Sequence, residues 1–108
     1  METIDIAQEI RRVSARLDKA PQAIFYNAKA FAEAERTYRM ELAKEITRLR
    51  AEGMQATLIS DVARGNVAEL KYKRDLAEGL YRSSLESTKA LQAELSGLQS
   101  IFKQFNEM

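Results

Sequence analysis

The side chains of this sequence that could do acid–base chemistry are carboxylates, because its 108 residues contain neither cysteine nor histidine. Thiol nucleophiles, disulfides, imidazole bases and nearly all transition-metal sites are therefore excluded. The candidate acids are Glu33, Glu41, Glu45, Glu78, Glu86 and Glu94. Nearly all have a basic residue three or four positions away, which is typical of a solvated helix face. We therefore predict a protein that is not an enzyme and that has no catalytic residues.

Patterns that hold metals, cofactors or phosphates are missing as well. Glu-x-x-His pairs cannot be formed without histidine, and the sequence has no calcium loop of alternating acids. The surroundings of Gly53 and Gly65 lack a glycine-rich phosphate loop. We expect no metal site, no cofactor and no small-molecule substrate.

Basic residues are concentrated between Ile46 and Arg74, where six of them stand against three acids. The candidate contact residues of this region, here called the basic tip, are Arg48, Arg50, Asp61, Arg64, Lys71, Lys73 and Arg74. One interpretation is a modest phosphate-binding patch. The favoured interpretation is that the arginines complement a helix C-terminus and the lysines form surface ion pairs.

The residues between Pro21 and Gly53 predict one long helix, over about 20–52. They are rich in helix formers, and apolar side chains recur at helical spacing from Ile24 to Leu49. Gly53 follows two arginines and is the expected C-cap. Residues 2–18 predict a further helix, with a break near 18–21 because proline favours the first turn of a new helix. One helix over 2–52, kinked at the proline, remains an alternative.

A second long helix is predicted over about 66–106, with Asn66 as its N-cap and Glu69 as the reciprocal acid. An alternating three-and-four spacing indicates a seam along its length. The seam consists of Val67, Leu70, Arg74, Ala77, Tyr81, Ser84, Thr88, Leu91, Leu95, Leu98, Phe102 and Phe105.

Residues 54–65 are predicted to be a loop with one short helical turn that closes the tip. So short a connector favours antiparallel neighbours, which would place Leu49 near Leu70 and Tyr38 near Tyr81. The fold class is therefore all-α: a single domain over 1–108, formed by a long, coiled-coil-like antiparallel hairpin with an N-terminal helix.

Apolar residues outside the hairpin's mutual interface predict a homo-oligomer, a dimer or larger. Two helices share one interface, and large exposed apolar patches usually mark another. The candidate oligomer interface consists of Tyr26, Met40, Tyr72, Leu76, Leu80, Leu85, Leu98, Ile101, Phe102 and Phe105.

Residues 49–59, 63–65, 67–71 and 74–78 carry a resemblance. Their sequence resembles a group of small helical proteins encoded in phages and prophages of Gram-positive bacteria, over about residues 25–105. Members of the group are mostly hypothetical proteins found among early genes near recombination functions. The resemblance implies an accessory role in the host cytoplasm and assigns no functional residues.

Together these features predict a non-catalytic phage or prophage accessory protein that acts through self-association and contact with a protein partner. This class includes inhibitors of a host nuclease or defence factor. The alternative is a weak nucleic-acid-binding accessory of phage recombination that uses the basic tip. The acidic N-terminus and the lack of an apolar run of about 20 residues predict a soluble intracellular protein with no membrane partner. The resemblance implies that this location is the cytoplasm of a bacterial host.

Overall fold

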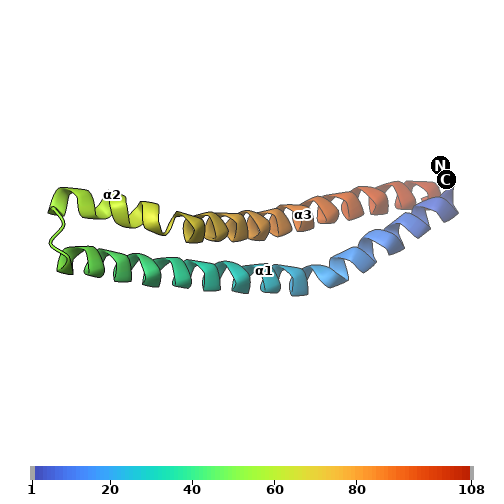
Figure 1. Ribbon diagram of the computed structural model, residues 1–108. Coiled ribbons are helices and arrows are strands. Elements are labelled where there is room, and N and C mark those ends of the chain that lie inside the picture. Colours follow the sequence, from blue (N-terminus) through green and yellow to red (C-terminus); the bar gives the residue numbers. More distant parts are fainter. Residues whose placement is uncertain (1, 108) are drawn as a thin grey trace. The chain divides into compact units, whose positions relative to one another are not determined.

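The computed structural model describes residues 2–107, and these residues form three α-helices and no strand (Figure 1). The helices are α1 (Thr3–Ala51), α2 (Ala56–Asn66) and α3 (Ala68–Glu107). The all-α prediction is confirmed. None of these three helices combines the length and the apolar character needed to cross a lipid bilayer.

Helix α1 runs through Pro21 without interruption. The predicted break near 18–21 is therefore wrong, and the alternative of one helix is the observed one. Proline removes one backbone donor and costs about 3 kcal/mol inside a helix. The apolar spacing continues through this point from Leu17 to Ala20 and Ile24, all of them half-buried, and this packing offsets the missing hydrogen bond.

Gly53 ends α1 in the way that the sequence predicts. Its φ of 85° lies in the left-handed region that glycine adopts without strain. The Gly53 N–H donates to the Arg50 carbonyl, and the Met54 N–H donates to the Leu49 carbonyl, both at 3.1 Å. These two bonds define a Schellman motif, and Met54 also packs against the cluster that contains Leu49.

Most of the predicted loop is helix α2, which has 11 residues. Asn66 is its last residue and does not cap α3, so the predicted capping box with Glu69 is wrong. Val67 alone separates the two helices: its N–H donates to Ala63, and its carbonyl accepts from Leu70. The physical reason is packing, because Ile59 and Ala63 on one face of α2 are buried against Leu49.

The chain divides into two compact units, which are described separately. Unit 2 is Asn27–Tyr81, and unit 1 contains the remaining described residues, 2–26 and 82–107.

In unit 2, residues near the end of α1 contact the end of α2, and residues earlier in α1 contact positions progressively later in α3. Glu45 contacts Asn66, Glu35 contacts Arg74, and Phe31 stacks on Tyr81 with ring centroids 6.3 Å apart. The observed register therefore differs by about seven residues from the predicted pairing of Tyr38 with Tyr81. The difference arises because α2, rather than the start of α3, packs beside the end of α1.

In unit 1, the first half of α1 contributes Ile6 and Val13, which are 0% and 2% exposed. Leu91 of α3 is also buried, and Leu95, Leu98 and Phe102 are half-buried. The predicted seam of α3 is confirmed at every position except Phe105, whose exposed fraction is 40%.

Candidate interaction surfaces

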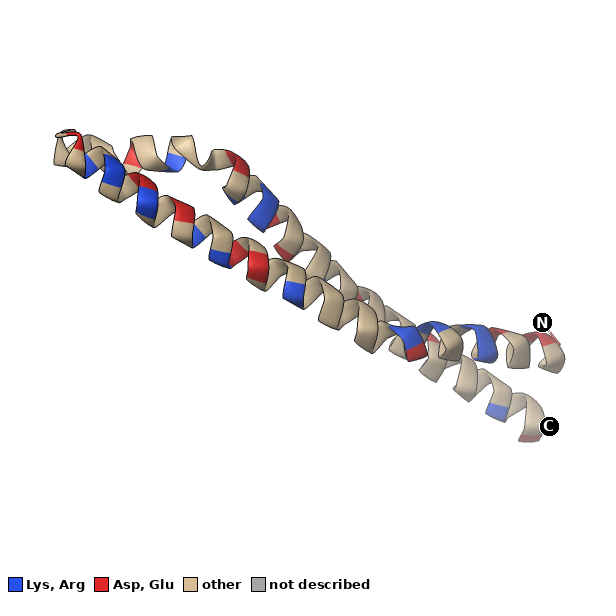
Figure 2. Cartoon of the chain, turned by 60° about the horizontal axis from the view of Figure 1, so that its bottom comes forward, with Lys and Arg blue, Asp and Glu red and all other residues tan. Residues whose placement is uncertain are grey.

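Much of the charge of the basic tip is neutralised within the chain. Arg48 forms ion pairs with Glu45 and Glu52, both at 2.8 Å, and Lys71 pairs with Asp75 at 2.8 Å. Figure 2 shows acidic positions interleaved with basic ones along this part of α1. Such i,i+3 and i,i+4 pairs are what a solvated helix face forms.

Arg74 is the most extensively engaged cation of the tip. Its guanidinium donates to Glu35 on α1 and to Asp75, and it lies 5.5 Å from the centre of the Phe31 ring. The hydrogen bond that Glu35 accepts from Arg74, and then the one that it accepts from Arg39, lower the pKa of the Glu35 carboxyl. Arg74 thus joins α1 to α3 within unit 2. Its pairing with an acid 39 positions away has no signal in local sequence spacing.

Glu45 is a second link between distant segments of unit 2. Hydrogen bonds from Arg48, and then one of 2.9 Å from the Asn66 amide, lower the pKa of the Glu45 carboxyl to about 2. A carboxylate with so low a pKa is a poor general base and is not protonated near neutrality. The most strongly perturbed carboxyls of this unit are therefore structural links rather than candidates for acid–base catalysis.

The other residues of the basic tip are exposed. Arg50, Arg64 and Lys73 form no ion pair within residues 2–107, and Asp61 lies exposed on α2. The structure thus leaves three of the six predicted cations available to a partner.

Large apolar side chains are exposed in unit 2. Tyr72, Leu76 and Leu80 follow one another at four-residue steps on α3, and their exposed fractions are 61%, 53% and 54%. Met40 on α1 is 51% exposed. We call these four residues the unit 2 apolar row.

A groove of about 360 Å³ lies between the helices of unit 2. Its lining residues are Ala30, Glu33, Ala34, Thr37, Leu70 and Lys73. Helical spacing places Met40 on the same side as Thr37, and Leu76 and Leu80 on the same side as Lys73. Three members of the unit 2 apolar row, Met40, Leu76 and Leu80, therefore lie on the sides of their helices that carry groove-lining residues.

The remaining predicted interface residues lie mainly in unit 1, and they divide into two groups. Leu98 and Phe102 are half-buried in the seam, as is Leu85 beside it. Tyr26, Ile101 and Phe105 are exposed, and so is Phe25, which the sequence argument did not include. In the sequence, Phe25 is adjacent to Tyr26 and does not fit the spacing of the seam. These two features could have identified it as an exposed apolar residue.

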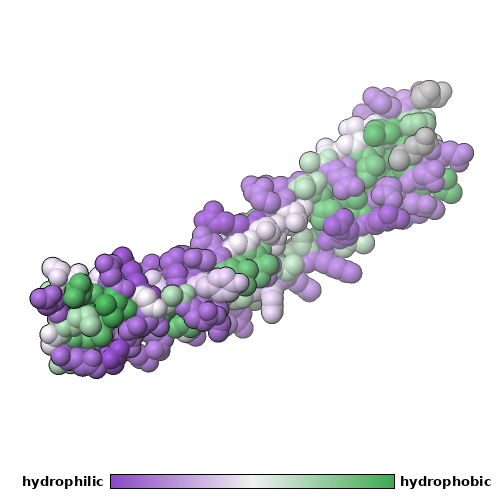
Figure 3. Space-filling model, turned by 45° about the horizontal axis from the view of Figure 1, so that its top comes forward, coloured by the Kyte–Doolittle hydropathy of each residue, from purple (hydrophilic) through white to green (hydrophobic). Residues whose placement is uncertain are grey.

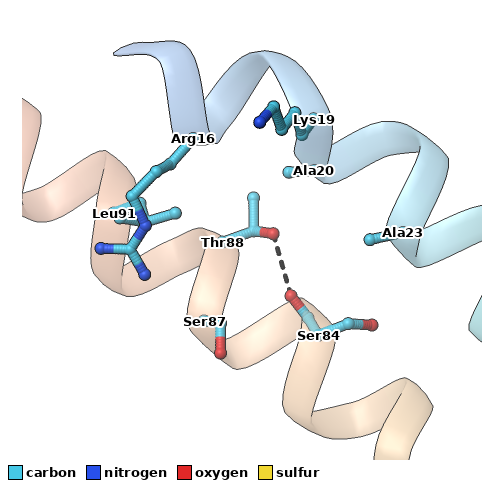
Figure 4. Close-up of a pocket in the computed structure, with 8 residues that line it drawn as sticks. All are labelled: Arg16, Lys19, Ala20, Ala23, Ser84, Ser87, Thr88 and Leu91. Atoms are coloured by element: carbon cyan, nitrogen blue, oxygen red, sulfur yellow. Dashed lines mark hydrogen bonds between the residues drawn. The ribbon is translucent and has the colours of Figure 1, made fainter. Parts of the chain in front are cut away.

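Unit 1 contains a hollow of about 370 Å³ between α1 and α3 (Figure 4). Its lining residues are Arg16, Lys19, Ala20, Ala23, Ser84, Ser87, Thr88 and Leu91. Small side chains on α1 face small side chains on α3, so the space between the helices is left unfilled. The Thr88 hydroxyl donates to the Ser84 carbonyl at 2.9 Å, and the figure shows its methyl group directed into the hollow.

Apolar residues are also visible at the end of unit 2 where α1 is followed by α2 (Figure 3). Leu58 there is 49% exposed, whereas the neighbouring Ile59 is buried. Within residues 2–107, no group of three or more acidic side chains is arranged to hold a metal ion.

Comparison of the chain with protein-family models, with curated proteins and with solved structures gives no match.

Proposed function

We propose that this chain is a non-catalytic accessory protein of phage or prophage origin that acts through self-association and contact with a protein partner. In this proposal it works in the host cytoplasm as an antiparallel helical hairpin, and its targets include a host nuclease or defence factor. The order of the contacts within unit 2 supports the hairpin.

The exposed apolar residues carry this proposal. Tyr72, Leu76 and Leu80 each leave more than half of their surface in water, and they are consecutive along one side of α3. Exposed apolar surface costs about 25 cal/mol per Å² relative to burial, so a row of three such side chains favours association.

The alternative is a nucleic-acid-binding accessory of phage recombination. Arg50, Arg64 and Lys73 favour it, because all three are exposed cations without an ion-pair partner among the described residues. The pairing of Arg48, Lys71 and Arg74 with acids of the same chain counts against it.

Light scattering after size exclusion tests the two functions, at low and high salt and with and without a short single-stranded oligonucleotide. The first proposal expects an oligomer whose mass is not increased by the oligonucleotide. Nucleic-acid binding expects a gain in mass that is lost at high salt, because phosphate contacts weaken steeply with ionic strength.

A pair of matched variants tests the role of the unit 2 apolar row. The double change Leu76→Gln and Leu80→Gln is expected to weaken association or partner binding, whereas Leu58→Gln, at a comparably exposed position on α2, is not. A monomeric wild-type chain at high micromolar concentration, with a mass that rises only with the oligonucleotide, would overturn the first proposal and support the alternative.

A further inference from the structure

In unit 1, Glu2 and one side of the following helix α1 together carry three acids followed by three bases. These residues succeed one another at steps of three and four residues, which keeps them on one side of a helix. They are Glu2, Asp5, Glu9, Arg12, Arg16 and Lys19, here called the charge stripe. All are exposed except the half-buried Glu9. Figure 2 shows the acidic positions nearest the N label and basic ones further along α1.

Two of the spacings within the charge stripe are unfavourable for an isolated helix, although its acids lie at the end of the helix that favours negative charge. Asp5 and Glu9 are like charges four residues apart, as are Arg12 and Arg16, and like charges at this spacing destabilise a helix. Further along, α1 also forms acid–base pairs at four-residue steps, such as Glu35 with Arg39 and Arg48 with Glu52. In the charge stripe, by contrast, acids and bases are grouped apart, which leaves most of these charges to groups outside the helix.

Ion pairing within the described residues agrees with this. Arg12 pairs with Glu9 at 3.0 Å, and this is the one pair that the charge stripe forms. Asp5, Arg16 and Lys19 form none in this part of the chain, and Glu94 on α3 pairs with no cation there either. Together with Glu2, which also forms no ion pair among the described residues, four charges of the stripe thus remain available.

The charge stripe is its own complement when it is reversed. We propose that a second copy of this chain docks on it in the antiparallel direction, with the two-fold axis passing between Glu9 and Arg12. The axis places Glu9 opposite Arg12, Asp5 opposite Arg16, and Glu2 opposite Lys19 of the second copy. Each pair occurs twice, as a symmetric dimer requires.

The same two-fold axis also brings a side chain of the second copy to the hollow of unit 1. The hollow extends from Arg16 and Leu91 at one end to Ala23 and Ser84 at the other (Figure 4). When the pairing of α1 with α3 seen at the hollow is continued toward the start of α1, the axis passes α3 near Gly97. Nothing lies within 4 Å of a Cβ added at Gly97, so the surface of α3 is open at this position. Reversal about Gly97 brings the exposed Phe105 of the second copy to the level of Lys89, the residue after Thr88. The dimer thus covers an exposed ring and fills an open hollow together.

This docking mode rests on the self-association part of the proposed function, and charge-altered variants separate the two. The all-acidic variant carries Arg12→Glu, Arg16→Glu and Lys19→Glu, and the all-basic variant carries Glu2→Lys, Asp5→Lys and Glu9→Lys. Each is expected to raise the dimer dissociation constant at least about tenfold, because every facing pair becomes repulsive. An equimolar mixture of the two is expected to recover the wild-type affinity, which a folding defect would not allow. Arg11→Glu, a neighbouring exposed position outside the stripe, is the control and is expected to change nothing.

A full exchange of the six charges tests the direction of docking. This variant combines the two sets of substitutions, so its stripe has three bases followed by three acids. Antiparallel docking expects it to dimerise with itself and to exclude the wild-type chain from mixed dimers. Parallel docking expects the reverse, and that result would overturn the proposal.

Cross-linking locates the axis on α3, because the chain has no natural cysteine. Gly97→Cys is expected to form a disulfide-linked dimer on mild oxidation, whereas Gln99→Cys, exposed on another side of α3, is not. A wild-type dimer that tolerates the all-acidic and all-basic changes, with no preference for Gly97→Cys, would refute this docking mode and leave self-association standing. A monomeric wild-type chain would refute both.

Discussion

Replacing Leu49 by alanine is expected to destabilise the end of unit 2 selectively. Leu49 is 3% exposed and forms a buried cluster with Ile59 and Ala63 of α2. Met54, Val62, Leu42 and Ile46 pack around it. Because this cluster is the apolar contact that holds α2 against α1, its loss acts first on α2.

The magnitude follows from burial and from the length of the helix. Truncating a buried leucine to alanine costs about 2–5 kcal/mol, and a site near the end of a unit can partly collapse, so we expect about 3 kcal/mol. Helices shorter than about 12–15 residues are marginal on their own in water. With its 11 residues, α2 therefore depends on this contact.

Hydrogen exchange measured by mass spectrometry or NMR is the appropriate assay. Amides of α2 in the Leu49→Ala variant are expected to exchange about a hundredfold faster, the change that corresponds to about 3 kcal/mol. Amides of unit 1 are expected to change far less. Leu58→Ala is the matched control, since Leu58 is on the same helix but 49% exposed, and it is expected to cost under about 1 kcal/mol. Equal acceleration in both variants, or acceleration spread evenly over α1 and α3, would refute the packing argument.

Three further predictions concern the backbone and the carboxylates. Gly53→Ala is expected to cost about 1 kcal/mol in urea unfolding because of its φ of 85°, whereas Gly79→Ala, in open space within α3, is expected to stabilise by a similar amount; the same sign for both would contradict this. Pro21→Ala is expected to raise the midpoint of thermal unfolding, because it restores a donor for the Leu17 carbonyl. An unchanged midpoint would show that Pro21 does not destabilise the helix. Because the folded-state pKa of Glu45 is lowered from 4.5 to about 2, its stabilising contribution is complete above about pH 4.5 and is lost as the pH falls toward 2. Thermal unfolding over this range is expected to show a smaller pH dependence for Glu45→Gln than for wild type, and identical profiles would be the contrary result.

The long-range periodicity of this sequence predicts its helices well. The seam of α3 was predictable position by position, because three-and-four spacing over many turns has no strand counterpart. Gly53 was predictable as well, since a glycine after a basic last turn fits a left-handed C-cap.

Single residues that are typical of helix boundaries were misleading in two places. Pro21 and Asn66 are typical of helix starts, yet Pro21 lies inside α1 and Asn66 is the last residue of α2, because tertiary packing outweighs single-residue preferences of a few kcal/mol or less. Treating 54–65 as a loop then displaced the expected register. The groove and the hollow were not predictable from one helix, because each depends on which small residues of α1 face which residues of the later helices.

Polar residues in the seam give unit 2 its register. A purely apolar seam with a seven-residue repeat tolerates a slip of one heptad, because leucine then meets leucine again. Here a slip would separate Arg74 from Glu35 and Asn66 from Glu45, and would leave half-buried charged groups without partners. Separating such a pair costs more free energy than forming it contributes to stability. The two links therefore act chiefly by destabilising the slipped registers. In unit 1 the first half of α1 carries the charge stripe, most of which is exposed. In the docking mode that we propose, charge pairing in unit 1 selects a second copy, as it selects the register inside unit 2.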